Sequence, residues 1–441
     1  MNKNLTAIIL LLTSALCSKA QDSTHAALLE KLYNPRNNFY NYSAPSINSY
    51  FNEKIRSDAE NRITVDFDYQ LNSNAAPANL TYKLLFKGPV NNNLKDRTNA
   101  LIKNQLKFED YMKTGISYRR YLRKWDGEIF LGYHHRQYRF LIAPKDAFQT
   151  VFYGNAMFED KTADFSNLAF TNNIYNQYSI GLNKTFTYAK YQMEFGATLS
   201  LLQIINFQEA KTKKTTLYTA PDGEYIEVNY DLTFNTVKEG AAKFTDLNGL
   251  GMGADFHLAF QNNDKWRVSL DVMDFGRFSS RKTPVNYSAA KNIKFQGVVL
   301  PELLNFSAQT FDTLNLDSAL RSNLPSKSGN RFSVLMPFSA QLVFSKPLLQ
   351  NKLVVSAGIM YRHLPRYYAY GFAKLNYFIK PDMVFSTSLG AGGYSLFNLG
   401  VDFSKSWKYF DFTIGTSNLL GLVAPSHMPG TSVYLRLASS F

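Results

Sequence analysis

The residues best suited to acid–base chemistry lie on two adjoining stretches of alternating sequence. His257 follows Asp255 by two positions on the first stretch, and Ser269 and Asp271 share one face of the second. A serine, a histidine and a carboxylate activate the nucleophile in many hydrolases, so a membrane lipid hydrolase is one hypothesis. No nucleophile-elbow motif accompanies Ser269. A polar group lining a barrel lumen explains the four residues at least as well, and we predict that the protein is not an enzyme.

The other histidines and the single cysteine do not form a metal site by their spacing. The histidines are His25, His134, His135, His257, His363 and His427. His134 and His135 are adjacent in a predicted strand, so their side chains point to opposite faces. Cys17 is the only cysteine and lies in a predicted leader, which leaves the mature chain without a thiol for a disulfide, a metal or a nucleophile. We therefore expect no metal and no cofactor.

A basic cluster marks one predicted turn. Arg119, Arg120, Arg123 and Lys124 lie close together in sequence, next to Trp125. Cationic side chains at a membrane surface contact lipid phosphate groups, which makes these four residues candidates for lipid-phosphate contacts. A solvated rim without a specific ligand is the alternative, and the pattern favours it.

The N-terminus has the pattern of a secretory signal peptide. Lys3 precedes the short apolar run 5–16. Small residues, Ser18 and Ala20, then occupy the two positions that a signal peptidase recognises. We predict a signal peptide over residues 1–20, with cleavage after Ala20.

One alternative to a cleaved leader is a lipoprotein anchor on Cys17. That processing needs a small residue before the cysteine, and this chain has Leu16 there. The sequence therefore favours a cleaved leader and an exported mature chain.

The composition favours strands over membrane helices. The chain has 35 Phe and 28 Tyr against 3 Trp, and its mean hydropathy is −0.24. No apolar stretch after the leader is long enough for a transmembrane helix. A polar, aromatic-rich exported chain can span a membrane as a barrel, whose strands alternate a lipid face with a lumen face. The formal net charge of +14 favours contact with anionic outer-membrane lipid, including lipopolysaccharide, and we expect no nucleic-acid partner because the chain is exported.

Alternation with a period of two recurs from about residue 62 to the end of the chain. The clearest stretches are 62–70, 191–201, 226–234, 250–260, 266–272, 338–344, 353–361, 397–403, 408–415 and 433–441. Most have about 8 to 12 residues, the length that a tilted membrane strand needs. One such stretch also fits a soluble sandwich. Their repetition over an exported chain predicts an all-β, transmembrane antiparallel barrel over residues 61–441.

The lengths of the links between these stretches support the same fold. Short polar links occur at 187–190, 261–265, 346–351, 379–382 and 404–407, and longer ones at 144–176, 275–332 and 416–431. Outer-membrane barrels have short periplasmic turns and long extracellular loops. We count about 14 strands between residues 127 and 441, with 12 to 18 open. Further candidates at 62–70, 80–87 and 113–122 would give 17, an odd number, so at least one candidate is wrong.

Two segments lie outside the regular pattern. Residues 21–60 are rich in Asn, Ser, Tyr and charge, with a short helix-like run at 25–32. They fit a lumen plug or a periplasmic segment, and equally a flexible tail. The large loop 275–332 contains three prolines, and we expect it to fold over the barrel mouth or to meet a partner.

The C-terminal strand has the pattern of an assembly signal. Val433, Leu435, Leu437 and Phe441 share one face, and Ser439 interrupts that face. A final aromatic residue fits the aromatic girdle of a barrel. We predict that this strand closes the barrel and is recognised by the barrel assembly machinery.

Several segments carry a resemblance to a known family. They are 143–155 (APKDAFQTVFYGN), 175–186 (YNQYSIGLNKTF), 247–260 (LNGLGMGADFHLAF), 269–278 (SLDVMDFGRF) and 410–425 (FDFTIGTSNLLGLVAP). Through them the chain resembles a Bacteroidetes outer-membrane barrel family known as domain of unknown function 5723. The resemblance implies a fold similar to the long-chain fatty-acid transporter and to accessory barrels of secretion machines. The family has no assigned activity, so the resemblance implies location and fold.

These observations leave three functional hypotheses for a protein of the bacterial outer membrane. The first is a non-enzymatic accessory or scaffold subunit with outer-membrane protein partners. The second is a transporter or channel for a hydrophobic or small polar solute. The third, less favoured, is a membrane lipid hydrolase.

Overall fold

The computed structural model describes residues 59–85, 88–189, 191–238, 242–262, 266–281, 284–295, 329–349, 352–380 and 382–441. The predicted signal peptide, nearly all of the 21–60 segment and residues 296–328 of the large loop lie outside the described residues.

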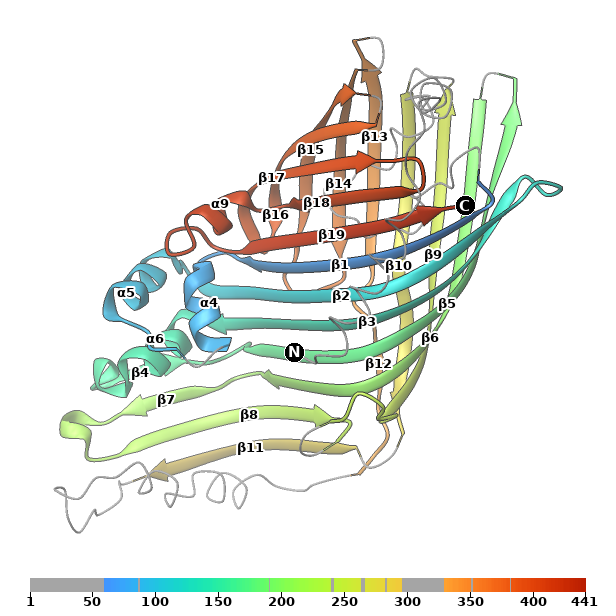
Figure 1. Ribbon diagram of the computed structural model, residues 1–441. Coiled ribbons are helices and arrows are strands. Elements are labelled where there is room, and N and C mark those ends of the chain that lie inside the picture. Colours follow the sequence, from blue (N-terminus) through green and yellow to red (C-terminus); the bar gives the residue numbers. More distant parts are fainter. Residues whose placement is uncertain are drawn as a thin grey trace.

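A closed ring of 14 antiparallel strands forms the body of the molecule (Figure 1). The strands, in ring order, are β1 (Asn61–Ser73), β2 (Gln105–Leu122), β3 (Gly127–Pro144), β5 (Ala169–Tyr188), β6 (Tyr191–Thr212), β9 (Gly249–Asn262), β10 (Trp266–Ser280), β13 (Ser339–Leu348), β14 (Leu353–Arg362), β15 (Tyr368–Lys380), β16 (Met383–Gly393), β17 (Ser395–Ser406), β18 (Phe410–Thr416) and β19 (Thr431–Ser440). The ring closes because β1 pairs with both β2 and β19. The predicted all-β barrel and its strand number are confirmed.

Backbone hydrogen bonds join the first residue of the ring to the last residue of the chain. The backbone N–H of Phe441 donates to the carbonyl of Asn61 at 3.0 Å, and the N–H of Asn61 donates to the carbonyl of Phe441 at 2.9 Å. A barrel in lipid must satisfy every backbone group from within, so this pairing leaves no open edge.

Short turns and long connections lie at opposite ends of the barrel. The turns that follow β5, β9, β13, β15 and β17 overlap the five predicted short links, and they lie at the end that holds Phe441. We assign this end to the periplasm by the rule that short turns face that side.

The other end, which we assign to the cell exterior, carries the remaining elements (Figure 1). Its helices are α4 (Ala78–Leu85), α5 (Asn92–Leu101), α6 (Lys145–Tyr153), η3 (Asn155–Phe158), η4 (Pro221–Gly223) and α9 (Leu419–Val423), and its strands are β4 (Lys161–Asp164), β7 (Thr216–Thr219), β8 (Ile226–Thr236), β11 (Val285–Phe295) and β12 (Ser333–Leu335). Within the described ranges, no helix has both the length and the apolar character needed to cross a bilayer.

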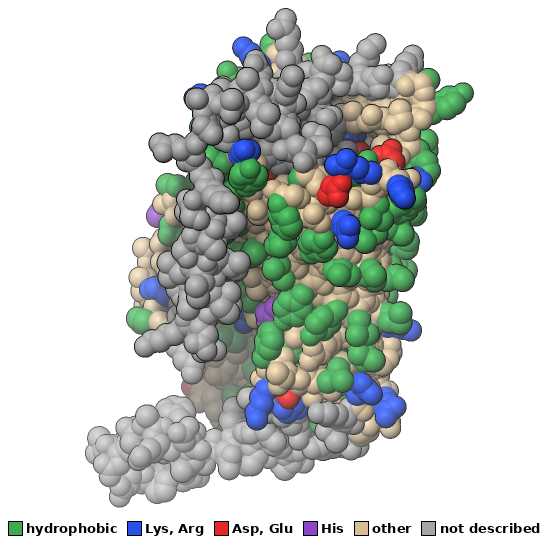
Figure 2. Space-filling model, turned by 45° about the vertical axis from the view of Figure 1, so that its right-hand side comes forward, with side chains coloured by type: hydrophobic (Ala, Val, Ile, Leu, Met, Phe, Trp, Pro, Cys, Tyr) green, Lys and Arg blue, Asp and Glu red, His purple; other side chains and the backbone are tan. Residues whose placement is uncertain are grey.

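Each ring strand divides its side chains between an apolar outer face and a polar inner face. On β9, Met252, Phe256 and Leu258 are exposed on the outside, whereas Asp255 and His257 are buried on the inside. The same division on neighbouring strands produces a broad band of hydrophobic side chains, with Lys and Arg nearer its two ends (Figure 2). Such a band matches the hydrocarbon layer of a membrane.

Two details of the strand assignment were wrong. The strand predicted at 80–87 is absent over residues 80–85, because residues 78–85 form helix α4 after Pro77. Leu80 is buried there in a small apolar cluster with Leu94 of α5 and Phe148 of α6, so helix packing outweighs the alternation of the sequence. The second error concerns the count of about 14 strands between residues 127 and 441. Only 12 of the 14 ring strands lie there, and β1 and β2 supply the other two.

The predicted outer face of the last strand lies on the outside of the barrel. Val433 and Phe441 are exposed, Leu435 and Leu437 are half-buried, and the alternating Tyr434 is buried.

We predict that Leu437→Asp, or removal of residues 439–441, prevents insertion. The substitution places a charge on the lipid face, and the deletion leaves the periplasmic ends of β1 and β18 without their pairing partners. Heat-modifiable gel migration of membrane fractions measures folding, and Leu437→Phe is the matched control. Normal insertion of the truncated chain would show that the terminal strand is not an assembly signal.

Candidate functional site

The predicted lumen group lies together on the inner wall of β9 and β10. Asp255, His257, Ser269 and Asp271 are all at least 95% buried. His257 Nδ1 lies 2.7 Å from Asp271 Oδ1, because the register places these two residues opposite each other. The structure therefore brings His257 and Asp271 into contact, and it places Asp255 and Ser269 on the same inner wall.

Two further residues complete this cluster, and the sequence reasoning missed them. Arg267 Nη2 lies 3.3 Å from His257 Nε2 and donates to Glu194 Oε2 on β6 at 2.9 Å. His257 therefore lies between two carboxylates, with Nδ1 facing Asp271 and Nε2 lying 3.6 Å from Glu194 Oε2. Arg267 and Glu194 both occupy inward positions of predicted strands, which is the signal that could have found them.

The cluster does not have the arrangement of a hydrolase. Ser269 lies opposite Ala259, two positions from the residue that faces His257. Asp255 Oδ1 accepts the backbone N–H of Asp274 at 2.7 Å, at a bulge where Asp274 has a φ of 62°. Asp255 therefore stabilises an irregularity of β10. Among the described residues, no group of three or more His, Cys, Asp or Glu side chains is arranged to hold a metal ion.

A second inward cluster joins β1, β2 and β3. Asp66 lies 3.0 Å from Lys113 Nζ and 3.1 Å from His134 Nε2. Gly115 of β2 makes room for the imidazole, since a Cβ there would lie 2.3 Å from His134 Cδ2. The three strands are neighbours, so these contacts run along the wall.

A third set of contacts, which we call the lumen bridge, crosses from wall to wall near the extracellular end. Its members are Asp274, Arg136, Tyr111, Arg362, Glu109, Asn72 and Ser395. Arg136 pairs with Asp274 and donates to the Tyr111 hydroxyl at 3.0 Å. The guanidinium of Arg362 lies 5.8 Å from the centre of the Tyr111 ring, a cation–π distance. The contacts therefore run without a gap from Asp274 through Tyr111 to Arg362.

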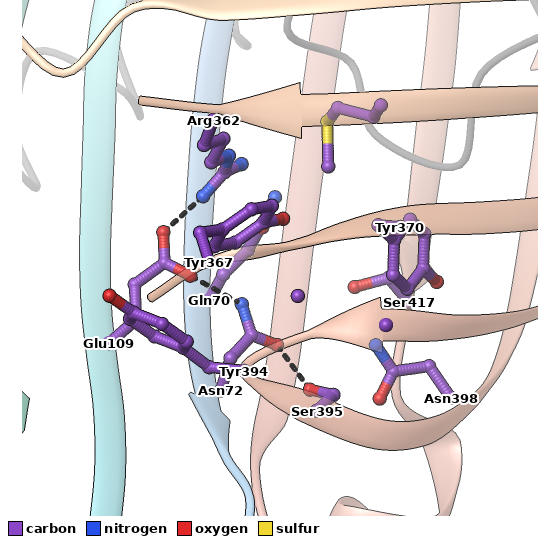
Figure 3. A pocket seen from close by; sticks show the side chains of 13 residues that line it. Gln70, Asn72, Glu109, Arg362, Tyr367, Tyr370, Tyr394, Ser395, Asn398 and Ser417 are labelled. Carbon is purple, nitrogen blue, oxygen red and sulfur yellow. Dashed lines mark hydrogen bonds and ion pairs between the residues drawn. The ribbon is translucent and has the colours of Figure 1, made fainter. Parts of the chain in front are cut away.

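The centre of the lumen bridge is the ion pair between Glu109 and Arg362 (Figure 3). Asn72 donates to the other carboxylate oxygen of Glu109 at 3.3 Å and accepts from Ser395 at 3.1 Å. In the ring of 14 strands, six strands separate β2 from β14 in either direction. Glu109 and Arg362 therefore join opposite walls of the barrel.

The β14–β15 connection reinforces this crossing. Lys107 Nζ of β2 donates to the carbonyl of Arg366 at 3.0 Å and lies 4.1 Å from the centre of the Tyr368 ring. Leu364 packs in a buried cluster with Tyr138 of β3 and other aromatic side chains. The extracellular half of the lumen is thus crossed by polar and apolar contacts.

A small cavity lies beside the lumen bridge (Figure 3). Its volume is about 30 Å³, room for a few water molecules. Its wall includes Gln70, Tyr367, Tyr370, Tyr394 and Asn398, besides the central ion pair. Tyrosine rings together with amide groups can bind a neutral solute through both stacking and hydrogen bonds.

The candidate lipid-phosphate cluster is divided by the barrel wall. The prediction was wrong for Arg119, which is 1% exposed and pairs with Glu128 at 3.0 Å inside the barrel. Alternation along β2 turns this side chain inward. Arg120, Arg123 and Lys124 are exposed at the periplasmic turn, where Arg123 pairs with Glu60 at 2.7 Å.

Most of the chain matches one protein family. Residues 57–417 match the family described as "Family of unknown function (DUF5723)". The chain belongs to this family. No curated protein sequence matches it.

Solved outer-membrane barrels of similar fold also match. The Pseudomonas putida toluene transporter TodX is 10% identical, with 86% of this chain and 88% of that chain covered and a TM-score of 0.39. The Ralstonia pickettii toluene transporter TbuX is 8% identical, with 87% and 90% covered and a TM-score of 0.42. A Pseudomonas aeruginosa FadL homologue is 7% identical, with 87% and 90% covered and a TM-score of 0.39. At these identities the likeness concerns the fold.

We predict that Arg267→Ala destabilises the folded barrel by about 3–5 kcal/mol, because it removes the guanidinium from a buried ion pair and leaves the carboxylate of Glu194 in the lumen wall. The double variant Glu194→Gln/Arg267→Met, which removes both charges, should recover most of that stability. Urea unfolding in lipid vesicles measures both. Equal stability of Arg267→Ala and the wild type would contradict a structural role for the cluster.

Proposed function

We propose that the protein is a non-enzymatic outer-membrane passage for a small polar solute, and that the structure represents its closed conformation. The observation that carries the proposal is the ion pair between Glu109 and Arg362, which joins opposite walls of the barrel. Separation of this pair is the movement that would open the extracellular half of the lumen.

The chemistry of the pair suits a contact that forms and breaks. A buried ion pair is a weak source of stability, because burial removes both charges from water. When the walls separate, water enters the lumen and solvates Glu109 and Arg362. The hydration of both groups offsets part of the lost contact, so the closed conformation is the more stable one by a margin small enough for the passage to open.

In the closed conformation the cavity has room only for water. When the lumen widens, the same wall suits a neutral, hydroxyl- or amide-bearing solute. Glu109 and Arg362 neutralise each other there, and Tyr394, Gln70 and Asn398 add a ring and two amide groups. The inner faces of the ring strands are also polar, which suits a hydrated path more than a path for a hydrocarbon.

The role as an accessory subunit was the first functional hypothesis, and it stays a prediction without support from the described contacts. The transporter alternative has the better support, since the bridge and the cavity both lie inside the lumen.

Export and assembly complete the proposal. The chain is synthesised with a signal peptide that is cleaved between Ala20 and Gln21, and the barrel assembly machinery inserts the mature chain. The alternating terminal strand and the apolar outer band support this route.

We predict that Arg362→Gln raises the flux of a neutral monosaccharide through the barrel by roughly tenfold, since a charged hydrogen bond contributes about 1.5–3 kcal/mol to the closed conformation. Efflux from liposomes and conductance across planar bilayers measure the change. Glu128→Gln is the matched control, because it removes a buried ion pair with Arg119 between adjacent strands. A correctly folded Arg362→Gln barrel with wild-type flux would show that the lumen bridge is only a brace.

A further inference from the structure

Three arginines gather on the outer face of the barrel near its extracellular end. Arg277 lies on β10, Arg281 follows that strand, and Arg331 precedes β12; all three are exposed. Ser279 pairs with Ser333 in the β10–β12 register. Continuing that register by two residues brings Arg281 opposite Arg331. Like charges directly opposite each other destabilise a sheet, so this pair is suited to an anion placed between the two guanidinium groups.

The chain itself supplies no such anion among the described residues. None of the described ion pairs includes these three arginines. The backbone N–H of Arg281 donates to the carbonyl of Asn248 at 2.8 Å, which brings Asp246 into this region of the chain. Asp246 is already bound by Lys238 Nζ at 2.7 Å and by the backbone N–H of Lys243 at 3.0 Å. These hydrogen bonds lower the pKa of Asp246 to about 2, so it stays an anion with partners of its own.

An open surface groove lies between the arginines. Its volume is about 490 Å³, and Arg281 and Arg331 line it together with Ser279, Ser333 and Leu250. Guanidinium groups can each donate two parallel hydrogen bonds to a phosphate, and the hydroxyl groups are further donors. Leu250 adds an apolar wall on the side of β9.

The groove lies where lipid headgroups begin. On β10 the outward side chains are apolar from Trp266 to Phe275, and Arg277 is the next outward residue. At about 3.4 Å per residue and a tilt of about 40°, this stretch rises roughly 25 Å, the height of the apolar band of such barrels. Met252 and Leu335, both exposed, flank Arg277 in the register and extend the apolar surface beside it.

We propose that this groove binds the phosphate group of an outer-leaflet glycolipid, with Arg281 and Arg331 holding the phosphate and Arg277 assisting. The acyl chains lie along the apolar side chains of β9, β10 and β12. The site is separate from the lumen and from the basic turn at residues 120–124, so it does not depend on the proposed transport function.

The experiment is native mass spectrometry of the full mature chain in detergent, with lipid A as the probe. Arg281→Gln/Arg331→Gln should bind lipid A at least tenfold more weakly, because it removes both cations that hold the phosphate. Arg281→Lys/Arg331→Lys keeps the charge but not the planar fork, and should bind with intermediate affinity. Lys213→Gln/Lys214→Gln removes two exposed cations from the same end of the barrel and should bind as the wild type does.

Two further probes identify the ligand. Lipid A from which the phosphates have been removed should bind the wild type as weakly as lipid A binds the double glutamine variant. Inorganic phosphate at the same concentration should fail to displace lipid A, because it lacks the contacts with the apolar band. Heat-modifiable migration confirms that each variant is folded. Unchanged binding by the double glutamine variant, tight binding of the dephosphorylated lipid, or displacement by inorganic phosphate would each overturn the proposal.

Discussion

The pairing of the first strand with the last is the constraint on which the rest of the structure depends. Asn61 and Phe441 exchange backbone hydrogen bonds, and the register continues from there along β1 and β19. In lipid an unpaired edge would leave backbone groups unsatisfied at a cost of several kcal/mol each. Closure makes every ring strand present one face to lipid and one to the lumen, which explains why the sequence alternates over most of its length.

Closure also determines where charge can be placed. Charged side chains are excluded from the apolar band and collect in the lumen, where they pair with each other. The cluster around His257 and the cluster around Asp66 join neighbouring strands, and the lumen bridge joins opposite walls. Outside the barrel, cations are found past the end of the apolar band, as Arg277 shows on β10. The closed ring of strands therefore accounts for the apolar outer wall, the paired charges in the lumen and the cations at the rim.

The alternation of the sequence predicted which side of the barrel wall a side chain occupies better than it predicted which side chains contact each other. It placed His257 and Asp271 on inward positions of neighbouring strands, and their contact follows from a short hairpin. It misassigned Arg119, because a cluster near a turn was treated as one surface although neighbouring residues of a strand point to opposite sides. It also assigned a strand to residues 80–87, where packing against α5 and α6 favours a helix.

The contacts of the lumen bridge could not be predicted from the sequence, for a physical reason. Glu109 and Arg362 are 253 positions apart, and their contact depends on the number of strands in the ring and on the shape of the barrel at one end. No local pattern contains either quantity. Each residue could be assigned to the lumen from its own strand, but their pairing required the closed fold.

The most direct test of the account is the distance between the two walls that the lumen bridge joins. Spin labels on cysteines that replace the outward residues Met112 on β2 and Tyr361 on β14 report this distance without touching the bridge. The account predicts one narrow distance distribution in the otherwise unchanged barrel, and a longer, broader one when Arg362→Gln is added. Identical distributions in the two proteins would show that the ion pair does not hold the walls together and would contradict the proposed closed passage.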